Sequence, residues 1–141
     1  MSVKYGRCLC GGVEYRVEGP LRDVVYCHCK MCRRASGHFF AATACALPQL
    51  FIVRSESLRW YRSSAEARRG FCGTCGSNLF WKPDSATHVS ILAGTLDDPT
   101  GVRAAAHIFV QNKGDYYGID DSLPQHIGGV HGVRLPASRS S

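Results

Sequence analysis

The sequence packs three cysteines, Cys27, Cys29 and Cys32, into the segment CHCKMC. Clustered thiolates are soft ligands that suit Zn²⁺. A structural zinc site takes four protein ligands, whereas a catalytic site usually takes three and leaves the fourth position open. The spacing therefore raises the question of which kind of site this triplet forms.

Two further cysteine pairs, Cys8 with Cys10 and Cys72 with Cys75, are each followed directly by glycine. Glycine lets the backbone turn tightly beneath a metal and direct amide N–H groups toward the sulfur atoms. Together the pairs supply four thiolates, enough for a tetrahedral structural zinc site that joins the N-terminus to a segment about sixty residues later. The alternative is that both pairs are unmetallated core or redox cysteines.

One cysteine and six histidines remain. Cys45 lies in the apolar residues 39–47 and is expected to be a buried free cysteine. His28 lies between two cysteines that must both face the metal, and an extended backbone would turn its ring to the other side. Each remaining histidine could reach the triplet in three dimensions: His38, His88, His107, His126 and His131. The sequence favours a triplet that binds zinc and keeps an exchangeable fourth position.

Length and charge narrow the class of protein. A chain of 141 residues suits one domain and is too short for two ordinary ones. The formal charge of +6 falls to about +3 if seven cysteine thiolates hold two Zn²⁺ ions, which weakens the case for nucleic-acid binding. The first ten residues lack the apolar segment of a signal peptide, so we expect a cytoplasmic protein with reduced thiols. Residues 39–47 are too short for a membrane span, so no membrane association is expected.

The hydrophobic pattern predicts an all-β fold. Apolar and polar residues alternate over residues 12–19, as in a half-buried strand. Further strands are expected at residues 38–47, 58–62, 78–81, 87–94 and 105–111. The best helical candidate is short, at residues 63–70. We expect a zinc-binding domain over residues 1–126 and a flexible tail, rich in Gly, Ser and Pro, over residues 127–141.

Five segments carry a family resemblance: CLCG, CHCKMCRRASG, RRGFCGTCGSNLF, AGTLDDP and HIFVQNKGDYYGIDDSLPQ. In this order and spacing they resemble the glutathione-dependent formaldehyde-activating enzyme family, which also includes centromere protein V. The resemblance implies a small β-tent of antiparallel sheets around two zinc ions per chain. It implies a structural zinc on Cys8, Cys10, Cys72 and Cys75, and a catalytic zinc on Cys27, Cys29 and Cys32. Tyr116 and His126 depart from the family pattern, which bears on the substrate and not on the metal ligands.

The chemistry of the triplet agrees with a sulfur substrate. Three thiolates give a Zn²⁺ centre a formal charge of about −1, which makes it a poor Lewis acid toward water and a good site for a soft thiol. A thiolate generated there can attack an aldehyde carbon to give an S-hydroxyalkyl adduct, and the reverse reaction is that of a carbon–sulfur lyase. The family resemblance implies glutathione and formaldehyde, as in an S-(hydroxymethyl)glutathione synthase. Carboxylates of a glutathione-like thiol are expected to bind Lys30, Arg33 and Arg34, which are otherwise solvated surface charges.

Two other interpretations remain open at the level of sequence. The first is a zinc-containing binding module for nucleic acid or protein, in which four arginines bind phosphate and three aromatic side chains stack on bases: Arg33, Arg34, Arg68 and Arg69, with Trp60, Tyr61 and Trp81. The modest corrected charge and the lack of a base-reading helix disfavour nucleic acid. The second is a purely structural role for both zinc ions.

Overall fold

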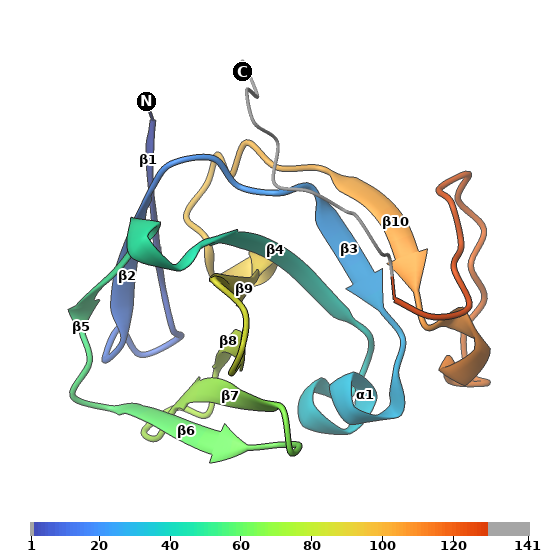
Figure 1. Cartoon of the computed structure of the whole chain (residues 1–141), viewed down its shortest axis with the longest axis horizontal. Helices are drawn as coiled ribbons and strands as arrows, with labels where there is room; N and C mark the ends of the chain where they lie inside the picture. Colours follow the sequence, from blue (N-terminus) through green and yellow to red (C-terminus); the bar gives the residue numbers. More distant parts are fainter. Residues whose placement is uncertain (1, 130–141) are drawn as a thin grey trace.

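The computed structural model describes residues 2–129, which form ten β-strands, one α-helix and three short 3₁₀ turns (Figure 1). Most of the tail expected at residues 127–141 lies outside these described residues. The smaller sheet has three strands in the order β1-β2-β5, and both pairings are antiparallel. Its strands are β1 (Val3–Arg7), β2 (Glu14–Glu18) and β5 (Leu50–Arg54).

The larger sheet has seven strands in the order β10-β3-β4-β9-β8-β7-β6. Its strands, in chain order, are β3 (Val24–Cys27), β4 (Phe40–Ala46), β6 (Leu58–Arg62), β7 (Ala67–Cys72), β8 (Asn78–Pro83), β9 (His88–Leu92) and β10 (Ala104–Ile108). The prediction of an all-β fold is confirmed. One pairing in the larger sheet is not antiparallel as expected, because β10 runs parallel to β3. These two strands lie far apart in the sequence, so no tight hairpin constrains their relative direction.

The predicted helix at residues 63–70 is wrong, since Ala67–Cys72 forms strand β7. Its Ala, Glu and Arg content favours a helix, but β7 pairs with strands on both sides, and this tertiary pairing overrides local propensity. The helix is instead α1 (Lys30–Ser36), which ends at Gly37 in a left-handed conformation with φ 87°. The 3₁₀ turns span Leu47–Gln49, Ala93–Thr95 and Val110–Asn112. Within residues 2–129, no helix is long and apolar enough to cross a membrane.

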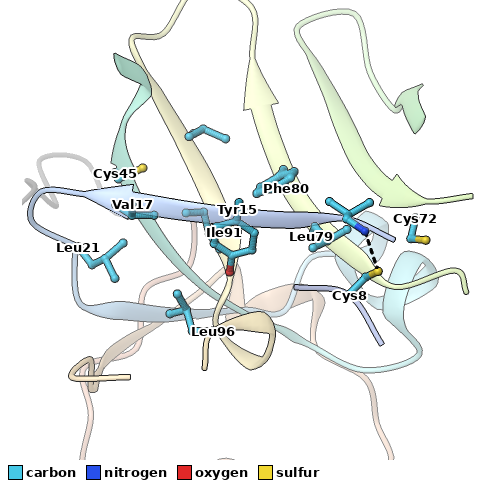
Figure 2. Close-up of a cluster of buried hydrophobic side chains, with 12 residues drawn as sticks. Cys8, Tyr15, Val17, Leu21, Cys45, Cys72, Leu79, Phe80, Ile91 and Leu96 are labelled. Atoms are coloured by element: carbon cyan, nitrogen blue, oxygen red, sulfur yellow. Dashed lines mark hydrogen bonds between the residues drawn. The ribbon is translucent and has the colours of Figure 1, made fainter. Parts of the chain in front are cut away.

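The core lies where strand β2 of the smaller sheet packs across β8 and β9 of the larger one (Figure 2). The buried ring of Tyr15 meets Phe80 edge to face, with 5.3 Å between the ring centroids. The Tyr15 hydroxyl forms a 2.7 Å hydrogen bond with Thr95, which satisfies this polar group inside the protein. Cys45 is fully buried in the same cluster, as expected for a free core cysteine, and burial raises its pKa to about 12. Cys8 and Cys72 border this core, so the first candidate metal site is continuous with it.

Candidate metal centres

The structure brings Cys8, Cys10, Cys72 and Cys75 together, with all four Sγ atoms within 4.8 Å of one another. The Sγ of Cys10 lies 3.7 Å from that of Cys8 and 3.7 Å from that of Cys72. Tetrahedral zinc with Zn–S bonds near 2.3 Å requires sulfur atoms about 3.8 Å apart. The four-cysteine cluster therefore fits a single zinc ion.

The backbone around this cluster has the geometry that the glycines led us to expect. Gly11 and Gly76, which follow the two cysteine pairs, both have φ 81°, a conformation that glycine adopts without strain. The turns direct amide groups at sulfur: Val13 N lies 3.3 Å from Cys8 Sγ, and Gly12 N lies 3.4 Å from Cys10 Sγ. Such N–H···S hydrogen bonds stabilise thiolates and orient them toward a common centre.

Two serines support the four-cysteine cluster and were missed by the sequence analysis. Ser77 Oγ lies 3.2 Å from Cys75 Sγ, and this hydrogen bond is the main reason that the pKa of Cys75 falls to about 5. Ser57 Oγ lies 3.3 Å from Cys72 Sγ and lowers its pKa to about 7. Ser77 lies two residues after Cys75, and this short spacing could have indicated its contact with the cluster from sequence alone. Ser57 comes from the turn between β5 and β6, and no such spacing indicated its contact.

The three-cysteine cluster lies where strand β3 leads into helix α1. Cys27 ends β3, Cys29 is the N-cap of α1, and Cys32 lies in the first helical turn. The Cys29 Sγ accepts a 3.3 Å hydrogen bond from Cys32 N, and the Cys27 and Cys32 Sγ atoms are 3.4 Å apart. All three Sγ atoms lie within 4.8 Å of one another, and within residues 2–129 no histidine or carboxylate joins the group. The cluster therefore offers zinc three protein ligands.

A guanidinium group lies against this cluster. Arg69, on strand β7, has 7% of its surface exposed and donates from Nη2 to Cys32 Sγ at 3.6 Å. The pKa of Cys29 is well below its usual range, first because of hydrogen bonds with Cys27 and Cys32, and Arg69 adds to the effect. These contacts favour a thiolate at Cys29, whereas hydrogen bonds with Cys29 and burial raise the pKa values of Cys27 and Cys32.

The four arginines of the binding-module hypothesis do not form one patch. Along β7 side chains alternate between the two faces. Arg68 is exposed and lies over the ring of Trp60, with 4.7 Å from its guanidinium carbon to the ring centroid. Arg69 points into the protein at the cysteines. The phosphate-binding patch expected from the sequence therefore loses one of its members.

The ring of His28 takes part in a hydrogen-bonded chain of four side chains. His28 Nδ1 lies 2.6 Å from Tyr117 Oη, His28 Nε2 lies 2.8 Å from His107 Nδ1, and His107 Nε2 lies 2.9 Å from the Asp121 carboxylate. The two imidazoles are only 1% and 3% exposed. Because the carboxylate can only accept, His107 donates to Asp121, His28 donates to His107, and Tyr117 donates to His28. These hydrogen bonds join the residue that follows β3 and strand β10 to the segment that follows β10.

No described histidine joins the three-cysteine cluster as a ligand. Burial and the neighbouring His107 lower the pKa of His28 to about 4, so its ring is neutral near pH 7, in agreement with the hydrogen-bond directions. His38 is exposed and lies 2.9 Å from the hydroxyl of Tyr116. His88 lies on β9, and His126 N donates to the backbone of His107. His131 lies outside the described residues.

The three cations expected to bind substrate all lie on α1, and their environments differ. Arg33 is half-buried, and its backbone N–H donates to Cys29 O at 3.0 Å, so it lies one helical turn after a cluster cysteine. Lys30 and Arg34 are exposed. Arg33 is therefore the most buried of the three α1 cations and follows Cys29 by one helical turn.

The fold and the two clusters define a class: a mostly antiparallel β protein with one four-thiol and one three-thiol group suited to zinc. The chain belongs to the glutathione-dependent formaldehyde-activating enzyme family, whose model matches residues 3–112. This confirms the resemblance seen in the cysteine segments. The match includes all seven clustered cysteines and both sheets.

Two similar proteins extend the comparison. An uncharacterised lyase of Schizosaccharomyces pombe is 32% identical over 78 residues, which cover 54% of this chain and 55% of that protein. The chain thus matches about half the length of this curated relative. A crystal structure of a Rhodobacter sphaeroides protein is 31% identical with a TM-score of 0.58, and the match covers 71% of this chain and 97% of that one.

Metal analysis of cysteine variants tests the division between the two clusters. The purified protein should hold two Zn²⁺ per chain. Cys75→Ser should lower the free energy of unfolding by several kcal/mol or abolish soluble expression, because binding of a structural zinc is coupled to folding. Cys29→Ser should remain folded and hold one Zn²⁺. Elemental analysis and thermal melts measure both effects, and equal melting behaviour of the two variants would contradict the division.

The hydrogen-bonded chain predicts a difference between two adjacent tyrosines. Tyr117→Phe leaves Nδ1 of the buried His28 without a donor and should cost about 1–3 kcal/mol of unfolding free energy. Tyr116→Phe is the matched control: this side chain is 58% exposed, and its loss should change stability by less than about 0.5 kcal/mol. Denaturant titrations of both variants measure the difference. If Tyr117→Phe lowers the free energy of unfolding no more than Tyr116→Phe does, the hydrogen-bonded chain does not stabilise the fold.

Proposed function

We propose that this protein is a zinc-dependent carbon–sulfur lyase that condenses a glutathione-like thiol with formaldehyde or a related aldehyde, and catalyses the reverse reaction. The observation that carries the proposal is the three-cysteine cluster, in which three thiols converge without a fourth protein ligand in the described chain. Membership of the glutathione-dependent formaldehyde-activating enzyme family supports the same thiol and aldehyde.

The two clusters take different roles in this proposal. Cys8, Cys10, Cys72 and Cys75 hold a structural zinc, because four thiols complete a tetrahedron and leave no position for substrate. Cys27, Cys29 and Cys32 hold the catalytic zinc. When bound there, zinc supplies an electrophilic centre that favours the deprotonated form of a substrate thiol at neutral pH.

The chain's own residues hold and orient this second site. Cys29 caps α1 and Cys32 lies in its first turn, so the start of the helix sets the relative position of two of the three sulfur atoms. The end of α1 is held to strand β8, because Asn78 Nδ2 donates to Ala35 O at 3.0 Å. A helix of this length is not stable by itself, so these contacts keep the cysteines in place.

Arg33 is the residue that we assign to binding a carboxylate of the thiol substrate. Its guanidinium offers paired N–H donors that match the two oxygens of a carboxylate. Lys30 and Arg34 contribute to the same positive surface at the helix, with weaker effect because both are exposed.

The reaction balances without an oxidant, a reductant or a third reactant. A carbon–sulfur bond forms between the thiol sulfur and the aldehyde carbon, and the carbonyl π-bond breaks. The thiol loses one proton, and the former carbonyl oxygen takes up one proton. This oxygen becomes the hydroxyl of the S-hydroxyalkyl product. The lyase direction reverses each change.

Exchange spectroscopy tests the activity directly. With formaldehyde and glutathione, the zinc-loaded protein should accelerate the exchange between free and adduct forms without shifting their equilibrium, as NMR magnetisation transfer can measure. Cys29→Ser protein at the same concentration controls for the uncatalysed reaction and for surface thiols and amines. No acceleration with any thiol, together with salt-sensitive binding of single-stranded nucleic acid, would favour the binding-module interpretation instead.

Substitution of the α1 arginines tests how the thiol is bound. Arg33→Gln should raise the KM for glutathione about tenfold, because a hydrogen bond to a charged group contributes roughly 1.5–3 kcal/mol. It should leave the KM for 2-mercaptoethanol, which has no carboxylate, nearly unchanged. Arg34→Gln is the matched control and should alter neither constant by more than about twofold. Equal effects of the two substitutions on glutathione would remove Arg33 from this role.

A further inference from the structure

The environment of Arg69 is unusual for a charged side chain. Its guanidinium is almost fully buried, lies over the ring of Phe40 at 4.9 Å from the ring centroid, and donates from Nη2 to Cys32 Sγ at 3.6 Å. Its Nη1 is buried and has no hydrogen-bond partner in the described chain. A buried charge without a compensating partner is costly, so a positive group kept here indicates negative charge nearby. The three-cysteine cluster is the group that it touches.

The two cysteine clusters differ in the kind of donor that stabilises their sulfur atoms. Within residues 2–129, the hydrogen-bond partners that we find for the sulfur atoms of the four-cysteine cluster are neutral: backbone N–H groups of the two turns, and the hydroxyls of Ser57 and Ser77. The three-cysteine cluster receives backbone N–H groups from its own residues Cys29 and Cys32, and also the full positive charge of Arg69. The cluster with fewer protein ligands is thus the one with a cationic neighbour.

A count of charges shows what this neighbour changes. Three thiolates and Zn²⁺ together carry a formal charge of about −1, and a substrate thiolate would bring it to about −2. A buried site resists such an accumulation of like charge. With Arg69 included, the assembly of zinc, three thiolates and substrate thiolate carries about −1. The positive charge of Arg69 therefore strengthens binding of an anionic ligand, but not that of a neutral ligand such as imidazole.

We propose that Arg69 is a positioning residue that compensates the charge of the three-cysteine cluster and makes the site prefer an anionic sulfur ligand over a neutral nitrogen ligand. The inference deepens the proposed function and rests on it in one respect, that the triplet holds a zinc-like metal. Arg69 acts through Cys32 and the local charge and not by contact with the reacting carbon.

Strand alternation supplies a matched control beside it. Arg68 carries the same charge one residue earlier on β7, but it is exposed and lies over Trp60. Substitution of Arg68 therefore removes the same charge from the protein without removing it from the cluster. Arg69→Lys keeps a positive charge and loses the planar guanidinium, which separates the effect of charge from that of hydrogen-bond geometry.

The experiment uses the full-length protein loaded with cobalt(II), whose visible absorption reports the ligands of the metal. Each variant is titrated with 2-mercaptoethanol and separately with imidazole at one fixed pH, after circular dichroism and metal content show that it is folded and loaded. The thiol has no carboxylate, so binding through Arg33 does not contribute. Arg69→Gln should weaken thiol binding at least about tenfold and change imidazole binding less than about twofold.

The controls make each result decisive. Arg68→Gln should match the unsubstituted protein, and Arg69→Lys should recover most of the preference for thiol. Equal loss of both ligands in Arg69→Gln, or no change in either, overturns the proposal. If Arg69→Gln does not fold, Arg69→Lys decides alone: a retained thiol preference supports the role of charge, and its loss overturns it.

The result is distinguishable from a failure of the proposed activity. A cobalt protein that prefers thiol through Arg69, but does not accelerate formaldehyde exchange in its zinc form, would sustain this inference and contradict the lyase proposal. An active enzyme whose ligand preference is unchanged by Arg69→Gln would support the lyase proposal and contradict this inference.

Discussion

The convergence of four thiols from two distant turns is the constraint on which the rest of the structure depends. Cys8 and Cys10 follow strand β1 of the smaller sheet, Cys72 ends strand β7 of the larger one, and Cys75 lies in the turn that leads to β8. Cys8 and Cys72 also border the buried cluster between the sheets. A metal held at this point would close a loop of about sixty residues and fix the relative position of the two sheets.

The relation between the sheets in turn places Arg69 and α1. Strand β7 carries Cys72 near the first cluster and Arg69 against the second, so a single strand connects the two sites. The helix that holds Cys29 and Cys32 is too short to be stable alone and relies on contacts with the larger sheet. The catalytic role that we propose for the three-cysteine cluster thus depends on the structural role that we propose for the four-cysteine cluster.

Buried polar groups on the far side of β3 complete the support of the site. His28 lies between two cluster cysteines in the sequence, but its ring joins Tyr117 and His107. Because each donor in this chain has one acceptor, ending at the carboxylate of Asp121, two imidazoles are buried without an unsatisfied ring nitrogen. The same chain holds the segment after β10 against the strand that carries Cys27.

The sequence by itself determined the β-rich fold, the family and the grouping of the seven cysteines. These depend on local patterns: alternation of side chains along a strand, and ligands a few residues apart in turns that glycine permits. Tertiary structure alone decided that residues 63–70 do not form a helix, that β10 runs parallel to β3, and that Ser57, Arg69 and His107 support the sites. Each of these features depends on contacts between segments that are distant in the sequence. Sheet register and strand face set such contacts, since a shift of one residue would have exchanged Arg68 for Arg69 beside Cys32.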